Sequence, residues 1–114
     1  MLEAPRFIQG IFPFEGKGLD QPSPLPSTSY KVPFDKRAQL IYVRFGNSSA
    51  GLLVISILRN GKLMRYVPVG AKAALHVTLA VTEDIDPESV IELAVSAEAG
   101  ASGSVVVDIG LVEI

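Results

Sequence analysis

Residues 51–70, GLLVISILRNGKLMRYVPVG, limit the possible folds of this chain more than any other stretch, because two apolar runs flank an Asn60-Gly61 pair. An Asn-Gly pair suits the two-residue turn of a β-hairpin. Both residues tolerate positive φ, and the twist of that turn matches the twist of paired strands. The pattern therefore predicts an antiparallel hairpin with a two-residue turn, in a register that places Ile57 opposite Met64.

The predicted hairpin is apolar on both faces. One face carries Leu53, Ile55, Ile57, Met64 and Tyr66, and the other carries Leu52, Val54, Leu58, Leu63, Val67 and Val69. A sheet normally buries one face against the core, so a second apolar face needs a second cover. An opposing sheet can provide one cover, and the N-terminal segment or another subunit can provide the other.

Several further segments alternate between apolar and polar residues with a period of two, namely residues 38–45, 73–81, 90–95 and 105–114. Short alternating runs separated by turn residues predict an all-β fold, a single antiparallel β-sandwich that is jelly-roll-like. The residues predicted to be buried are Ile41, Val43, Leu53, Ile55, Ile57, Leu75, Val77, Leu79, Ile91, Leu93, Val95, Val107 and Ile109. Residues 89–101 are rich in Ala and Glu and could form a helix instead.

The N-terminal part of the chain differs in composition from the rest. Residues 1–36 hold most of the eight prolines, and the QPSPLPS stretch at residues 21–27 favours extended backbone without ladder hydrogen bonds. Residues 6–14 alternate enough to form an edge strand, although Pro13 excludes a central place in a sheet. We therefore predict a proline-rich extended arm over residues 1–36 and a β-sandwich domain over residues 37–114.

The composition favours association with another protein surface. Hydrophobic residues make up 48% of the chain and charged residues only 19%, whereas about 25% charged is usual for globular domains. We predict a non-catalytic structural or accessory subunit that forms a homo-oligomer or docks on a larger assembly, with its arm contributing. The predicted interface residues are Phe7, Phe12, Phe14, Tyr42, Leu52, Val54, Tyr66 and His76.

The sequence offers little catalytic chemistry. His76 is the only histidine, cysteine is absent, and no serine lies in a Gly-x-Ser-x-Gly elbow, so we predict no enzyme, no cofactor and no metal centre. An acidic group of Glu83, Asp84, Asp86 and Glu88 could supply oxygen ligands to Ca²⁺. Its spacing is not that of an EF-hand and it lacks the central glycine. A solvated loop is the preferred interpretation, and calcium binding stays open.

Charge and hydropathy narrow the possible partners. The formal net charge of −2 gives no long-range attraction for nucleic acid. The first residues lack the basic and apolar parts of a signal peptide, and no apolar run approaches the roughly 18 residues that span a bilayer. These features predict a soluble protein without membrane insertion, in a compartment left undetermined. The alternative function is a ligand-binding jelly roll, such as a carbohydrate-binding module, although there is no Trp to stack on a sugar.

Overall fold

The computed structural model describes residues 4–80 and 82–114, and these residues form strands and loops without a helix. The strands are β1 (Ala4–Glu15), β2 (Gly18–Pro24), β3 (Tyr30–Lys31), β4 (Ala38–Asn47), β5 (Leu53–Arg59), β6 (Lys62–Val69), β7 (Ala74–Thr78), β8 (Val90–Ala97) and β9 (Ser102–Glu113). The stretch that could have been helical is thus largely the strand β8. Strong alternation prevails there over the helix propensity of Ala and Glu.

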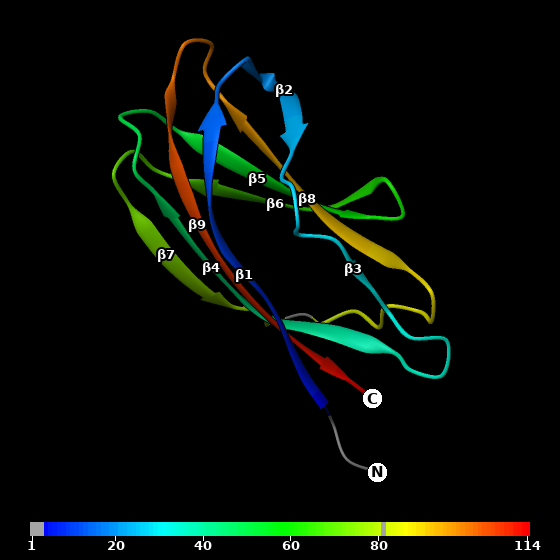
Figure 1. Cartoon of the computed structure of the whole chain (residues 1–114). Coiled ribbons are helices and arrows are strands. Elements are labelled where there is room, and N and C mark those ends of the chain that lie inside the picture. The colour runs from blue at the N-terminus through cyan, green and yellow to red at the C-terminus, as the bar shows by residue number, and fades with distance from the viewer. Residues whose placement is uncertain (1–3, 81) are drawn as a thin grey trace.

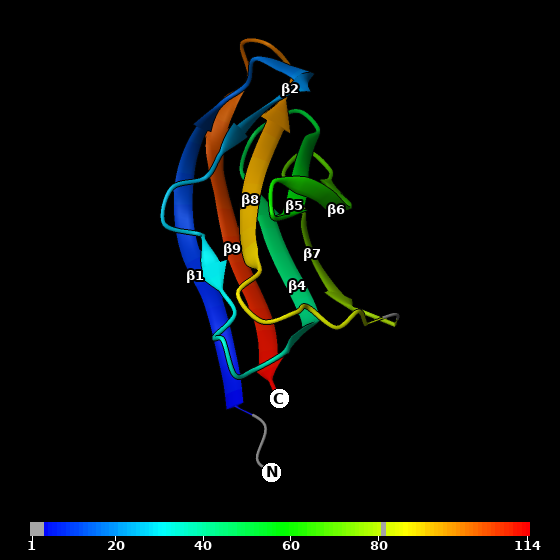
Figure 2. The same cartoon turned by 90° about the vertical axis from the view of Figure 1, so that its right-hand side faces the viewer.

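The strands form two antiparallel sheets that pack face to face. The first sheet has the order β1-β9-β4-β7, and the second has the order β2-β8-β5-β6, with β3 also paired to β8. Figure 1 shows the two layers side by side, and Figure 2 views them from the side of the second sheet. The prediction of an all-β, jelly-roll-like antiparallel sandwich is confirmed.

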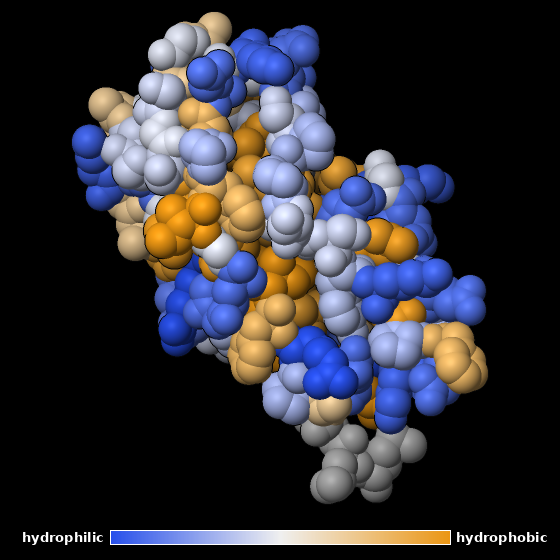
Figure 3. All heavy atoms as spheres, in the orientation of Figure 1, coloured by the Kyte–Doolittle hydropathy of each residue, from blue (hydrophilic) through white to orange (hydrophobic). Residues whose placement is uncertain are grey.

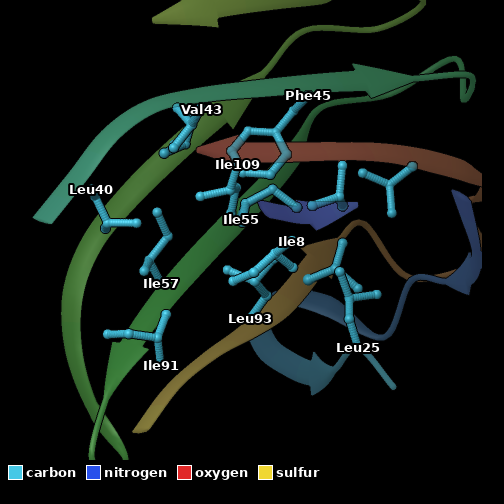
Figure 4. Packing of buried hydrophobic residues seen from close by; sticks show 14 of the residues in the cluster. Ile8, Leu25, Leu40, Val43, Phe45, Ile55, Ile57, Ile91, Leu93 and Ile109 are labelled. Atoms are coloured by element: carbon cyan, nitrogen blue, oxygen red, sulfur yellow. The ribbon is translucent and has the colours of Figure 1, made fainter. Parts of the chain in front are cut away.

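The core lies between the two sheets and is made of aliphatic side chains around Phe45 (Figure 4). Nine of the residues predicted to be buried are buried: Val43, Leu53, Ile55, Ile57, Ile91, Leu93, Val95, Val107 and Ile109. The prediction was wrong for Val77, which is 40% exposed, and only half right for Leu75 and Leu79, which are half-buried. These three lie in or next to β7, a short edge strand that, among the described strands, pairs with β4 alone.

A bulge explains the fourth residue placed wrongly, Ile41. The pairing of β4 with β9 shifts between Leu40 and Tyr42, so Ile41 is the extra residue. Leu40 therefore faces the core and is buried, whereas Ile41 is only half-buried. Strict alternation through this strand cannot predict the change of face.

The central hairpin has the predicted turn but not the full predicted register. Asn60 and Gly61 have φ values of 52° and 79°, as a type I′ turn requires. A register shift then places Ile57 opposite Arg65 instead of Met64. This single-residue shift turns Val67 and Val69 into the core, while Tyr66 points outward and is 67% exposed.

The N-terminal segment is built into the sandwich. β1 pairs with β9 over all twelve of its residues, from Ala4 opposite Glu113 to Glu15 opposite Ser102. Four apolar side chains from this part of the chain are buried in the core: Ile8, Phe14, Leu25 and Val32. A boundary at residue 36 would therefore cut through one shared core, so the predicted division into arm and domain does not match this packing.

A polar contact ties the two sheets together at the edge formed by β1 and β3. Glu113 lies at the end of β9 with a side chain that is 4% exposed, and it pairs with Arg6 of β1 at 3.3 Å. The hydroxyl of Tyr30, in β3, donates a hydrogen bond to the same carboxylate. Burial, followed by this hydrogen bond and the negative charge of Glu113, raises the pKa of Tyr30 above its ordinary value.

The raised pKa of Tyr30 predicts a loss of stability at alkaline pH. Above about pH 10 an unfolded tyrosine releases its proton, whereas Tyr30 keeps its proton in the folded state. The unfolded state then binds fewer protons, so the free energy of unfolding falls as the pH rises. Thermal melts between pH 8 and pH 11 should show a steeper fall for the wild type than for Tyr30→Phe, which should be less stable by roughly 1.5–3 kcal/mol near neutrality because it loses a hydrogen bond to a charged group. Tyr66→Phe, at an exposed position, is the matched control and should follow the wild type.

Candidate functional site

The outer face of the first sheet carries apolar, polar and charged side chains, several of them exposed. We define the outer face as the side chains of β1, β9, β4 and β7 that point away from the core. The strand registers arrange them in rows across the sheet: Phe7, Gly110, Tyr42 and Thr78; then Gln9, Asp108, Arg44 and His76; then Ile11, Val106, Gly46 and Ala74. A polar row thus runs between two rows that are mainly apolar.

Asp108 organises the polar row. Its Oδ1 accepts hydrogen bonds from Gln9 Nε2 at 3.1 Å and from the hydroxyl of Tyr42 at 3.0 Å. Its Oδ2 lies 3.6 Å from Arg44 Nη1. One carboxylate therefore joins side chains from β1, β4 and β9, and its charge is balanced within the outer face.

The ring of Tyr42 lies across β9 because Gly110 has no side chain. A Cβ added at Gly110 would collide with the Cδ2 and Cε2 atoms of the ring. The guanidinium carbon of Arg44 lies over the ring, 5.1 Å from its centroid, and His76 meets it edge-on at 5.6 Å between centroids. Desolvation and the hydrogen bond to Asp108 raise the pKa of the Tyr42 hydroxyl.

Three large apolar side chains of the outer face are open to water. Phe7 is 57% exposed, Ile11 is 70% exposed and Val106 is 45% exposed. Ile11 and Val106 are paired across β1 and β9, and Phe7 lies four residues before Ile11 on the same face of β1. This apolar patch, Phe7, Ile11 and Val106, has no cover among the described residues.

A shallow depression of about 420 Å³ lies beside the apolar patch. Its lining includes Gly46, Ala74, His76, Arg44 and Val106. The depression exists because Gly46 and Ala74 are small; a Cβ at Gly46 would lie 3.3 Å from the Cβ of Val106. The outer face therefore carries protruding apolar side chains and a hollow in the same row.

The eight predicted interface residues fall into three groups. The first group lies together on the outer face and consists of Phe7, Tyr42 and His76. The second group belongs to the region of the second sheet and consists of Leu52, Val54 and Tyr66. In this second group Leu52 and Tyr66 are exposed, and Val54 is half-buried. Phe12 packs partly buried against the core, and Phe14 is 7% exposed within it. Phe14 is thus a core residue of its own chain, because even-numbered positions of β1 face inward, and it is unsuited to contact a second chain.

The acidic loop at residues 83–88 is fixed by arginines from separate parts of the chain. Glu83 lies 3.4 Å from Arg65, Asp84 lies 3.6 Å from Arg37, and Asp86 lies 3.2 Å from Arg59, each measured between nitrogen and oxygen. The carboxylates therefore point toward different arginines. Among residues 4–80 and 82–114, no group of three or more His, Cys, Asp or Glu side chains is arranged to hold a metal ion. The same ranges contain no helix with the length and hydropathy needed to cross a bilayer.

Comparisons with known proteins extend the fold assignment. No protein-family model and no curated protein sequence matches this chain. A family 35 carbohydrate-binding module from Clostridium thermocellum is similar in structure, with a TM-score of 0.50, 11% identity and coverage of 95% of this chain and 97% of that module. A protein of T=1 particles derived from infectious bursal virus also has a TM-score of 0.50, with 16% identity and coverage of 98% of this chain but 31% of that protein, so this chain spans about a third of its length. At such low identity these similarities show the β-sandwich fold alone.

Proposed function

We propose that this protein is a non-catalytic structural β-sandwich subunit that associates with copies of itself through β1 and the adjoining outer face. The observation that carries the proposal is the apolar patch, in which Phe7, Ile11 and Val106 are all exposed by 45% or more. Burying apolar surface releases roughly 25 cal/mol per Å². A patch of this kind on a soluble domain commonly marks a contact surface.

The polar groups of the outer face support a structural role over a catalytic one. Asp108 is already engaged by Gln9, Tyr42 and Arg44. A general base or nucleophile needs a free lone pair directed at a substrate, and it usually has a second group that activates it. Because Asp108 already has partners on the outer face, a second surface that covers it would not leave its carboxylate buried without a partner, which is the most costly case.

A glycan ligand is the other candidate, and less of the geometry supports it. Sugars stack on exposed aromatic faces. The ring of Tyr42 rests on Gly110, and Arg44 lies over it, so much of its surface is occupied. Phe7 is exposed on the same face, but Tyr42 in its row and Gln9 two residues along β1 are both already hydrogen-bonded to Asp108. We therefore favour self-association.

The proposal predicts that the double variant Phe7→Ser/Ile11→Ser associates at least about 30-fold more weakly than the wild type, because two anchors of roughly 1–2 kcal/mol each are lost. Size-exclusion chromatography with light scattering over a concentration series measures the change. The folded monomer should keep its strand spectrum, because both side chains point away from the core.

Leu63→Ser/Tyr66→Ser is the matched control. These side chains are 48% and 67% exposed on β6 of the second sheet, so the control removes similar apolar surface from a different part of the molecule. It should leave association unchanged. A wild-type protein that stays monomeric throughout the series, or equal weakening by both double variants, would contradict the proposal.

A further inference from the structure

The free edge of the first sheet has an unusual hydrogen-bonding pattern that follows from two prolines. β1 lies at the end of its sheet and pairs with β9 alone among the described strands. In an antiparallel pair, successive residues direct their backbone N–H and C=O groups alternately toward the partner and away from it. Proline has no N–H, so Pro5 and Pro13 occupy positions whose backbone groups point away from β9.

The same alternation sets the direction of the residues between the prolines. Phe7, Gln9 and Ile11 are also odd-numbered, so their N–H and C=O groups point to the free edge, while their side chains lie on the outer face. Figure 1 looks toward this edge, with β1 nearest the viewer in the first sheet. Figure 3, in the same orientation, shows hydrophobic side chains in the middle of this side of the molecule. The edge therefore offers three backbone donors next to apolar side chains.

The sequence of β1 is symmetric about Gln9. Phe7 and Ile11 lie two residues to either side, and Pro5 and Pro13 lie four residues to either side. If two such strands ran antiparallel with Gln9 opposite Gln9, Phe7 of each copy would face Ile11 of the other. The prolines would face each other at both ends, where neither can donate a hydrogen bond.

We propose that β1 pairs antiparallel with β1 of a second copy, about a two-fold axis at Gln9, and joins the two four-stranded sheets into one. This inference rests on the proposed self-association and specifies its geometry. Phe7, Gln9 and Ile11 of each copy donate to the other, and two Phe7–Ile11 pairs pack across the junction. The prolines end the ladder on both sides, and the two-fold symmetry closes it as a dimer.

Two details of the structure fit this register. The carbonyl of Pro5, which would face a proline without an N–H, already accepts a hydrogen bond from the Arg6 guanidinium at 3.1 Å. No charged side chain lies between the prolines at an odd-numbered position, whereas the edge strand β6 carries Lys62 and Arg65. Lysine and other charges commonly protect sheet edges from pairing. β1 lacks that protection over the stretch that the dimer would use.

A single-cysteine variant tests the register. The chain contains no cysteine, so Gln9→Cys introduces the only thiol. On the two-fold axis the two Cα atoms would be about 5.5 Å apart, a distance that a disulfide can span. Under mild oxidation Gln9→Cys should form a species of twice the 12.1 kDa chain mass on a non-reducing gel. Glu15→Cys, also exposed on β1, is the control and should form little, because its two copies would lie far from the axis on opposite sides.

A proline variant tests the backbone pairing independently. Gln9→Pro removes a backbone donor that points away from β9, so the variant should keep its strand spectrum. Light scattering should show that it is a monomer. The control Gln9→Ala, which keeps the backbone donor, should remain a dimer. If Gln9→Pro does not fold, the comparison of the Gln9→Cys and Glu15→Cys cross-links tests the strand pairing by itself. Two results would overturn the strand pairing: a folded Gln9→Pro that still associates, or a Gln9→Cys cross-link no stronger than that of Glu15→Cys. Either result would leave the proposed self-association in place. A monomeric wild type overturns both.

Discussion

Deletion of residues 1–16 is expected to unfold the domain at room temperature. The deletion removes β1, which covers one edge of β9 along its full length, and it removes Ile8 and Phe14 from the core. Truncating a single buried side chain of this size typically costs about 2–5 kcal/mol. Two such losses and the loss of a twelve-residue ladder together match the whole stability of a typical domain, about 5–15 kcal/mol. Circular dichroism should show loss of the strand spectrum and of the cooperative thermal transition.

A peptide supplied in trans provides the control for this deletion. A synthetic peptide of residues 4–15 should restore the strand spectrum, because an extended segment can be added to an exposed sheet edge. The same peptide with Ile8→Ser and Phe14→Ser should not, because it keeps the backbone donors but loses the two core side chains. If the deletion variant alone keeps a cooperative transition, the segment is a dispensable arm, as its proline content suggested.

The sequence was sufficient to predict the fold class because two local signals agreed. The Asn60-Gly61 pair predicts a hairpin turn, and the observed φ values are those of that turn. Alternation in the segments that became β4, β8 and β9 predicted strands with one buried face, and most of the expected core residues are buried. These signals depend on near neighbours in the chain, so a single sequence contains them.

The errors in the hairpin and at Ile41 arose where one residue changes the face of a strand. The shift beyond Ile57 in the hairpin and the bulge at Ile41 both leave the strand in place but reverse the alternation after it. The packing of both sheets determines where a bulge forms, and no particular residue type marks its position in this sequence. The hairpin prediction therefore placed Val67 and Val69 on the wrong face and Tyr66 on the core side.

The outer face could be predicted only in part. Alternation alone places Val106 and Asp108 on the face of the last strand opposite its core residues. It cannot show that Gln9, 99 residues earlier, donates a hydrogen bond to Asp108, because strand order in a sandwich depends on long-range contacts. The one available signal was the glycine at residue 110, since a glycine inside an apolar strand often marks a close approach by another group. In the structure that group is the ring of Tyr42.

Ile55→Ala is expected to destabilise the monomer by about 2–5 kcal/mol. Ile55 is 0% exposed and lies on β5 between Val67 of β6 and Val95 of β8, so strands on both sides hold its surroundings in place. A cavity left there would collapse only partly, and the lost transfer free energy would add to the cost of the void. Chemical denaturation at a fixed protein concentration, with the midpoint and slope compared to the wild type, measures the loss.

Val54→Ala tests whether this cost comes from a core on one side of the second sheet. Val54 is the preceding residue on the same strand and points to the opposite face, where it is half-buried between Ser96 and Pro68. Its truncation should cost about 1 kcal/mol or less, since it removes less buried surface and leaves no closed cavity. A neutral Ile55→Ala would contradict the packing between the sheets. Equal losses at the two positions would mean that the second sheet is covered on both faces in solution, and association would then involve Leu52, Val54 and Tyr66 as well as β1.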